Sequence, residues 1–143
     1  MLFASPTNPP RMQGLHLTAD LYDCQGTPEL LVCAQALGEL CRGRTRDAGL
    51  TQVGETWVTF PSSDGRPGGV TGTVLLAESH LAIHTWPELG HVTLDVYVCN
   101  FSGDNTERAE QLLQSITHAL APRRTLVNRL RRGELAASPV QAT

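Results

Sequence analysis

Strict alternation of apolar and polar residues in two distant segments is the feature that most constrains the fold. In residues 14–24 (GLHLTADLYDC) the apolar side chains Leu15, Leu17, Ala19 and Leu21 alternate with polar ones, and residues 91–99 (HVTLDVYVC) repeat the pattern. A period of two is typical of a β-strand that buries only one of its faces. Both segments therefore predict strands of a sheet that is covered on one side.

Two amphipathic segments can form the covering layer. Thr27, Pro28 and Glu29 have the pattern of an N-cap, a first-turn proline and a first-turn acid, and predict a helix that ends between Gly43 and Gly49. A second helix is predicted from about Asn105 to Leu120, with Asn105 or Thr106 as its cap. The apolar stripes of the two helices are Leu30, Ala34, Leu37 and Cys41, and Ala109, Leu112, Leu113, Ile116 and Leu120.

The remaining segments complete an α+β fold. Further strands are predicted at about 50–60, 70–77, 81–86 and 124–130, and the turn-rich segment 61–69 (PSSDGRPGG) predicts a loop. The order of strand, helix, several strands, helix and strand favours a two-layer sandwich, in which helices pack on one face of a largely antiparallel sheet. Residues 14–132 form the single predicted domain, between a flexible arm at 1–13 and a polar tail at 133–143.

The composition excludes one class of amino-acid chemistry. The 11 basic residues are all arginines, so the chain contains no lysine. It therefore cannot hold pyridoxal phosphate as a lysine aldimine, form a lysine Schiff base with a substrate, or supply the lysine of a phosphate-binding P-loop. Covalent catalysis must start from another group.

Charge and hydropathy set expectations for partners and location. The net charge of −3 gives no general attraction to nucleic acid, although arginines gather at 42–46 and at 123–132. No apolar run approaches the roughly 18 residues of a membrane span, and the N-terminus lacks the pattern of a secretory signal. We therefore expect a cytoplasmic protein that binds neither nucleic acid nor membrane.

The four cysteines do not form a metal-binding or disulfide pattern. Cys24, Cys33, Cys41 and Cys99 contain no C-x-x-C pair, and reduced thiols are expected in the cytoplasm. Cys33 and Cys41 fall in the first predicted helix, where they are expected to be small buried side chains.

Residues 69–99 hold most of the candidate chemistry, and two conventional sites can be drawn from them. His80, His84 and Cys99 could ligate a metal, but His80 and His84 fall in a strand pattern rather than on one helical face. Ser79, His84 and Asp95 could form a hydrolase triad, but Ser79 lacks the G-x-S-x-G elbow. Neither site is favoured, and no metal is expected.

Taken together, the residues in this window resemble a known signature. Residues 69–72 (GVTG) and 77–88 (AESHLAIHTWPE) are similar to the signature of the prokaryotic pyruvoyl-dependent S-adenosylmethionine decarboxylases. The resemblance extends over about residues 14–130, and the ESH-x3-HTWPE stretch is highly specific.

The resemblance implies a self-cleaving proenzyme. Ser79 would attack the carbonyl of Glu78, and the chain would divide into a β chain, 1–78, and an α chain, 79–143. The new terminus would be a pyruvoyl group made from Ser79, which serves as the electron sink without pyridoxal phosphate or metal. His84 matches the residue that removes the Cα proton during processing, and Thr71 stands where the family usually has a serine.

The resemblance also implies roles in substrate turnover. Cys99 matches the proton donor of the family, and its place on the polar face of its predicted strand supports a site role. Phe60, Trp86 and Glu88 are candidate contacts for an adenine-bearing sulfonium substrate. The segment after Phe60 is longer than is usual in the family, with SSDGR inserted beside the expected nucleoside pocket.

Geometry adds one further expectation. In a continuous strand Ser79 and His84 point to opposite faces and lie about 16 Å apart, so their cooperation predicts a bend near residues 79–82.

Three functions remain open at this point. The first is decarboxylation of S-adenosylmethionine, which supplies the aminopropyl donor for spermidine synthesis. The second is the same pyruvoyl chemistry on L-ornithine or L-arginine, and the third is a non-catalytic relative that acts as a partner subunit. The family also implies a homodimer of cleaved protomers with active sites near the interface.

Overall fold

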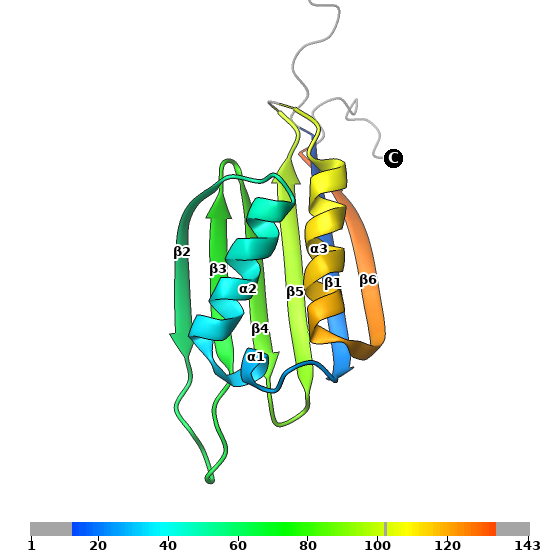
Figure 1. Ribbon diagram of the computed structural model, residues 1–143. Helices are drawn as coiled ribbons and strands as arrows, with labels where there is room; N and C mark the ends of the chain where they lie inside the picture. The colour runs from blue at the N-terminus through cyan, green and yellow to red at the C-terminus, as the bar shows by residue number, and fades with distance from the viewer. Residues whose placement is uncertain (1–12, 102, 134–143) are drawn as a thin grey trace, which may run out of the picture.

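Six strands form one antiparallel sheet in the order β2-β3-β4-β5-β1-β6 (Figure 1). The structure is a computed structural model, and it describes residues 13–101 and 103–133. The elements are β1 (Gly14–Cys24), α1 (Glu29–Val32), α2 (Ala34–Asp47), β2 (Gln52–Thr59), β3 (Val70–Leu76), β4 (Ser79–Trp86), β5 (His91–Cys99), α3 (Thr106–Leu120) and β6 (Pro122–Arg132).

Helices α2 and α3 lie side by side on the same face of the sheet, with the short α1 below α2 (Figure 1). The predicted α+β two-layer sandwich is therefore confirmed. The predicted arm and tail, at 1–13 and 133–143, fall outside the described residues except for Gln13 and Gly133. No helix in the described part of the chain is long and apolar enough to cross a membrane.

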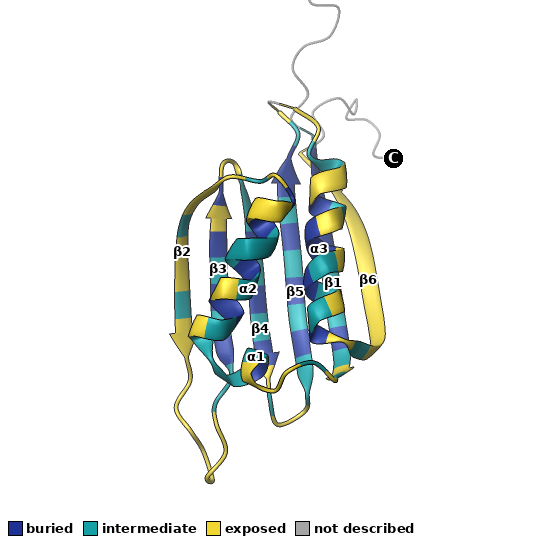
Figure 2. Cartoon of the chain, viewed as in Figure 1, coloured by how far each residue is buried: buried dark blue, intermediate teal, exposed yellow. Residues whose placement is uncertain are grey.

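The core lies between the sheet and the two long helices. Figure 2 shows burial alternating along the central strands, as the period-two pattern of β1 and β5 predicted. Leu17 of β1, Leu94 of β5 and Ile116 of α3 are at most 2% exposed. At the β2 side, Trp57 packs so closely over Gly72 that a Cβ on Gly72 would lie 2.0 Å from the indole ring. Only glycine fits at that point of β3.

The first predicted helix is divided in two. Cys33 has extended backbone angles (φ −117°, ψ 111°) and separates α1 from α2, so the single helix expected from Thr27 onward is wrong. The Cys33 sulfur instead accepts a hydrogen bond from the backbone nitrogen of Ala36 at 3.4 Å and caps α2. Cys41 is fully buried as expected, whereas Cys33 is only partly buried.

The C-terminal strand is longer than predicted. It covers Pro122–Arg132 rather than residues 124–130, and it pairs with β1 from Gly14 to Cys24. Its arginines contact other parts of the same chain: Arg123 pairs with Asp23 at 3.3 Å, Arg129 with Glu110, and the Arg124 guanidinium lies 4.0 Å from the ring centroid of Tyr22. These contacts account for much of the basic cluster at 123–132.

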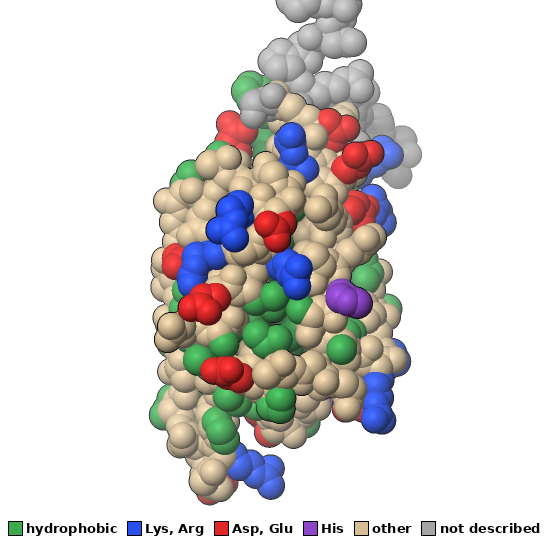
Figure 3. All heavy atoms as spheres, in the orientation of Figure 1, with side chains coloured by type: hydrophobic (Ala, Val, Ile, Leu, Met, Phe, Trp, Pro, Cys, Tyr) green, Lys and Arg blue, Asp and Glu red, His purple; other side chains and the backbone are tan. Residues whose placement is uncertain are grey.

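The two faces of the sheet differ. On the helix-covered side, acidic and basic side chains are interspersed around a central hydrophobic area (Figure 3). None of the described helices covers the opposite face. From the strand register, that face carries large apolar side chains that are between 38% and 51% exposed, namely Val58, Leu75, Trp86, Leu126 and Leu130. We call this surface the open face.

Candidate active site

Ser79 and Cys99 are brought together at one end of the sheet. Ser79 begins β4, Cys99 ends β5, and the backbone nitrogen of Cys99 donates a hydrogen bond to Ser79 Oγ at 3.0 Å. Cys99 is 7% exposed. The two residues expected to form the pyruvoyl group and to donate the proton are therefore neighbours, although 20 positions separate them in the sequence.

The peptide bond before Ser79 follows a strained residue. Ala77 and Glu78 form the two-residue turn between β3 and β4, and Glu78 has φ 61°. This left-handed conformation favours glycine and costs other residues about 1–2 kcal/mol. Strain of this kind concentrates at functional positions, and here it lies at the bond that the family resemblance implies is cut.

Two asparagines that the sequence did not single out as site residues hold this end of β5. Asn105 Nδ2 donates to the carbonyl of Cys99 at 3.1 Å, and Asn100 Oδ1 accepts from the backbone nitrogen of Asn105 at 2.8 Å. Asn105 was expected only as a helix cap, yet its side chain makes no capping bond to α3. It fixes the backbone on which the Cys99 thiol is carried.

Thr71 and His84 form a second group on the open face. They are directly opposite each other in the β3–β4 register, and Thr71 Oγ1 lies 3.1 Å from His84 Nδ1. The hydroxyl predicted to assist processing therefore contacts the predicted acid/base. A hydrogen bond to Nδ1 orients the imidazole and leaves Nε2 available for proton transfer.

A cavity of about 850 Å³ adjoins His84 and extends to the β2–β3 loop. All three predicted substrate contacts, Phe60, Trp86 and Glu88, line it, as do Thr71 and His84. Its volume is in the range of pockets that enclose small ligands. Buried Thr85 fixes the strands behind it, because its hydroxyl accepts from the Val70 nitrogen at 2.8 Å and donates to the Leu31 carbonyl at 2.7 Å.

The predicted bend near residues 79–82 is absent. β4 pairs with β3 from Ser79 to His84 and with β5 from His80 to Trp86 without a register shift, because it lies in the middle of the sheet. Ser79 follows the alternation of the buried residues and His84 lies on the open face, about 16 Å further along the strand. One chain therefore holds two half-sites: Ser79 with Cys99, and Thr71 with His84 and the cavity.

Neither conventional alternative site is assembled. The hydrolase triad is not formed, because His84 bonds to Thr71 while Asp95 bonds to two other histidines. Among the described residues, no two of His80, His84 and Cys99 belong to the same cluster of potential metal ligands.

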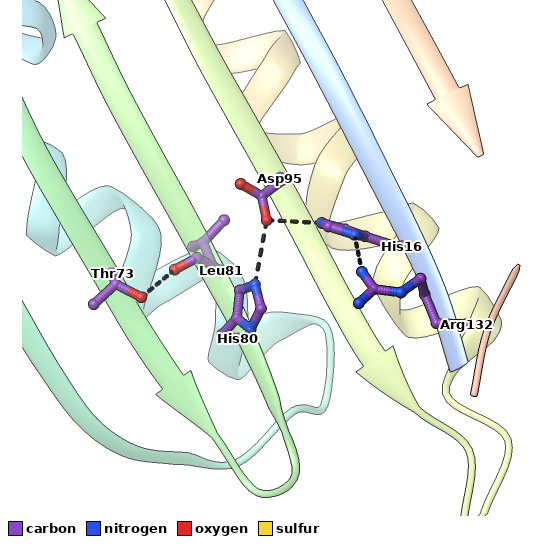
Figure 4. Close-up of polar contacts among 6 residues, drawn as sticks. All are labelled: His16, Thr73, His80, Leu81, Asp95 and Arg132. Atoms are coloured by element: carbon purple, nitrogen blue, oxygen red, sulfur yellow. Dashed lines mark hydrogen bonds and ion pairs between the residues drawn. The ribbon is translucent and has the colours of Figure 1, made fainter. Parts of the chain in front are cut away.

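A different cluster crosses four neighbouring strands of the open face (Figure 4). Asp95 Oδ2 lies 2.9 Å from His16 Nε2 and 3.3 Å from His80 Nε2, and Arg132 Nη1 lies 2.9 Å from His16 Nδ1. The three potential ligand atoms of His16, His80 and Asp95 lie within 4.8 Å of one another.

Arg132 argues against a metal at this cluster. A guanidinium only donates hydrogen bonds, so His16 Nδ1 must accept and His16 Nε2 must carry the proton that points to Asp95. A histidine in this tautomer has no lone pair on Nε2 for a metal. We conclude that the cluster is a hydrogen-bond network that ties β4, β5, β1 and β6 together.

Burial distinguishes two of the thiols. It raises the pKa of Cys41 to about 12 and, together with the charge of Asp23, raises the pKa of Cys24 to about 11. Both remain protonated at neutral pH, which makes them poor nucleophiles.

Comparisons with known proteins agree with this arrangement. The sequence model of the S-adenosylmethionine decarboxylase family matches residues 15–133. The chain belongs to the S-adenosylmethionine decarboxylase family. Membership confirms the resemblance found in the sequence and makes the protein a decarboxylase, which is a carboxy-lyase.

Relatives in the S-adenosylmethionine decarboxylase family match most of the chain. A proenzyme of that name from Thermoplasma volcanium is 35% identical over 122 residues, which are 85% of each protein. Another from Aquifex aeolicus is 40% identical over 111 residues, which are 78% of this chain and 74% of that protein. The crystal structure of the adenosylmethionine decarboxylase from Aquifex aeolicus covers 93% of this chain at 32% identity, with a TM-score of 0.71. The fold is therefore that of the family.

Proposed function

We propose that this protein is a self-cleaving decarboxylase of S-adenosylmethionine that uses a pyruvoyl group made from Ser79. Its product would be the aminopropyl donor for spermidine synthesis. The observation that carries the proposal is the juxtaposition of the strained Glu78, Ser79 and Cys99 at the start of β4. We also propose a cytoplasmic location, because all four cysteines are free thiols, as is usual in a reducing compartment.

Self-cleavage needs only groups that the chain carries. Ser79 Oγ attacks the carbonyl carbon of Glu78, and the amide nitrogen of Ser79 leaves as an amine, so the peptide bond becomes an ester. Removal of the Ser79 Cα proton then expels the Glu78 carboxylate and leaves dehydroalanine. Addition of water and loss of ammonia convert dehydroalanine to the pyruvoyl terminus. His84 is the proposed base for the Cα proton, and the Glu78 strain is relieved by the cut.

The residues present fit a pyruvoyl group. When formed, its carbonyl supplies the electron sink for breaking the Cα–carboxylate bond of an α-amino acid. The chain has no lysine that could provide this chemistry through pyridoxal phosphate. Cys99 would act as the proton donor to the product carbon from its buried place beside Ser79, which hinders exchange with bulk water.

We further propose that two copies of the chain share each site. Ser79 and His84 are about 16 Å apart on opposite faces of one strand, which is too far for direct proton transfer. A second copy of the chain would supply the missing base if its His84 reached the first copy's Ser79 at the start of β4. The exposed apolar side chains of the open face support such a partner.

The cavity supports S-adenosylmethionine over ornithine or arginine as the substrate. Phe60 and Trp86 offer aromatic surfaces that suit a purine, and Glu88 offers a carboxylate to a ribose or a sulfonium. Ornithine and arginine have no aromatic part that would use these surfaces.

Intact mass spectrometry and an activity assay test the proposal together. Cleavage between Glu78 and Ser79 divides the 143 residues into fragments of 78 and 65 residues, the smaller one blocked by the pyruvoyl group. The purified protein should release carbon dioxide from S-adenosylmethionine faster than from ornithine or arginine. Ser79→Ala should remain one chain and release none. An uncut wild-type chain without activity would contradict the proposal and favour a partner subunit.

A further inference from the structure

The β2–β3 connection is an ordered hairpin extension rather than an irregular loop. Ser63 and Arg66 exchange two backbone hydrogen bonds of 3.0 and 2.9 Å, and Phe60 donates to the Gly69 carbonyl at 2.9 Å. Asp64 and Gly65 both have positive φ, 52° and 74°, which is the signature of a two-residue type I′ turn. Such a turn presents its side chains from a defined backbone, and the extension projects beyond the end of the sheet (Figure 1).

Two charged side chains of this hairpin line the cavity without any partner. Asp64 and Arg66 both border it, together with Phe60 at the base of the hairpin. Among the described residues, neither Asp64 nor Arg66 makes a side-chain hydrogen bond or an ion pair. A carboxylate and a guanidinium therefore face the cavity with their hydrogen-bonding capacity free for a ligand.

The order of residues along the cavity fixes which end of a substrate meets the hairpin. In the proposed shared site, His84 acts on the Ser79 of the second copy, so the methionyl part of the substrate lies beside His84 in the cavity. Phe60 pairs with Gly69, two positions before Thr71, so Phe60 lies about level with Trp86, and the hairpin continues from there away from His84. Because a nucleoside extends away from the reacting amino acid, its base is the part that reaches the hairpin.

We infer that the hairpin 61–68 is a nucleobase-recognition element, in which Asp64 accepts a hydrogen bond from the 6-amino group of adenine and Arg66 donates to a ring nitrogen. This inference rests on the proposed function and adds the source of base selectivity. Adenine offers this pair of groups on its edge, an amino donor and unprotonated ring nitrogens. Hypoxanthine keeps N3 and N7 but has a carbonyl in place of the amino group, which would meet the Asp64 carboxylate acceptor to acceptor.

The charge of the substrate distinguishes a direct hydrogen bond from Arg66 from a long-range electrostatic effect of Arg66. S-adenosylmethionine carries a sulfonium and an ammonium against one carboxylate, so its net charge is positive. Acting only through space, Arg66 would repel this substrate, and its replacement by glutamine would strengthen binding. Weaker binding after Arg66→Gln would therefore require a hydrogen bond that is lost.

The test measures binding and self-cleavage separately. In the uncleavable Ser79→Ala chain, calorimetry would give the Kd of S-adenosylmethionine and of its hypoxanthine analogue, S-inosylmethionine. We expect the adenine ligand to bind about tenfold more tightly. Asp64→Ala removes the acceptor, so it should weaken the adenine ligand more than the hypoxanthine ligand and bring the two Kd values together. Arg66→Gln should weaken both ligands about fivefold. Arg46→Gln, on exposed α2 surface and outside the cavity lining, is the matched control.

Equal weakening of both ligands by Asp64→Ala would overturn the inference, because it would mean that the carboxylate acts only by attracting the sulfonium. The inference would also be overturned if both hairpin variants had Kd values within twofold of the Kd of the Arg46→Gln control. The proposed function is tested independently by introducing the same hairpin substitutions into the chain that keeps Ser79 and measuring its self-cleavage by intact mass. If a hairpin variant cleaves normally but no longer distinguishes the two bases, the hairpin acts in base recognition alone. If the unsubstituted chain does not cleave, the proposed function itself has failed.

Discussion

Thr71 Oγ1 lies 3.1 Å from His84 Nδ1 across the β3–β4 register, on the open face of the sheet. The contact orients the imidazole that is proposed as the base for processing. Thr71→Val keeps the branched shape and removes the hydroxyl, so we expect self-cleavage to slow by about tenfold to a hundredfold. The measurement is the fraction of cleaved chain over time by intact mass.

Thr71→Ser is the matched control for this prediction. Serine keeps the hydroxyl and rotates more freely about χ1, so cleavage should proceed at least as fast as in the wild type. Equal rates in Thr71→Val and Thr71→Ser would show that the hydroxyl is not used.

A mixture of two inactive variants would test the shared site. If the His84 of one copy serves the Ser79 of another, a His84→Ala chain should be cut when it is paired with a Ser79→Ala chain that still carries His84. Each variant alone should stay intact. Co-expression with different affinity tags and mass analysis of each chain would reveal which is cut. Failure of the His84→Ala chain to cleave in purified heterodimers would disprove sharing.

The fold could be predicted from the sequence where the pattern is local. The alternation in residues 14–24 and 91–99 predicted the first and last residues of β1 and β5 correctly. A strand that buries one face is recognised from the period of its side chains alone. The edge strand β6 was too short in the prediction because nearly all its residues are exposed and no alternation marks its ends. The break at Cys33 was missed, because the apolar stripe continues through it and only the cap bond to Ala36 reveals it.

The sequence predicted which residues form the candidate site but not how they are arranged. The motif named Ser79, His84 and Cys99, but the expected bend followed from the assumption that one chain completes the site. A central strand with partners on both sides resists such a bend, so the structure keeps the residues apart. His16 was not named because its contact with Asp95 joins residues 79 positions apart, which no local pattern can show.

The network around Asp95 should contribute measurably to stability. Asp95 Oδ2 accepts from His16 and His80, and its side chain is 28% exposed. Asp95→Ala leaves both imidazole N–H groups without their acceptor, and we expect a loss of about 1–2 kcal/mol in the free energy of unfolding. Urea denaturation gives this value, and Asp47→Ala at the exposed end of α2 is the control. Asp95→Asn retains a carbonyl acceptor and should lose less, so a larger loss in Asn than in Ala would contradict the network.

The buried thiol of Cys41 predicts how stability changes at alkaline pH. Burial raises the pKa of Cys41 to about 12 in the folded chain, compared with 9.0 for an exposed thiol. Between these values the unfolded chain loses a proton that the folded chain retains, so the contribution of Cys41 to stability is complete below pH 9 and declines as the pH rises toward 12. We expect the free energy of unfolding of the wild type to fall by about 1 kcal/mol more than that of Cys41→Ala between pH 8.5 and pH 10. Parallel urea titrations of the two proteins at these pH values provide the measurement. Identical slopes for wild type and Cys41→Ala would mean that this thiol ionises equally well in the folded state.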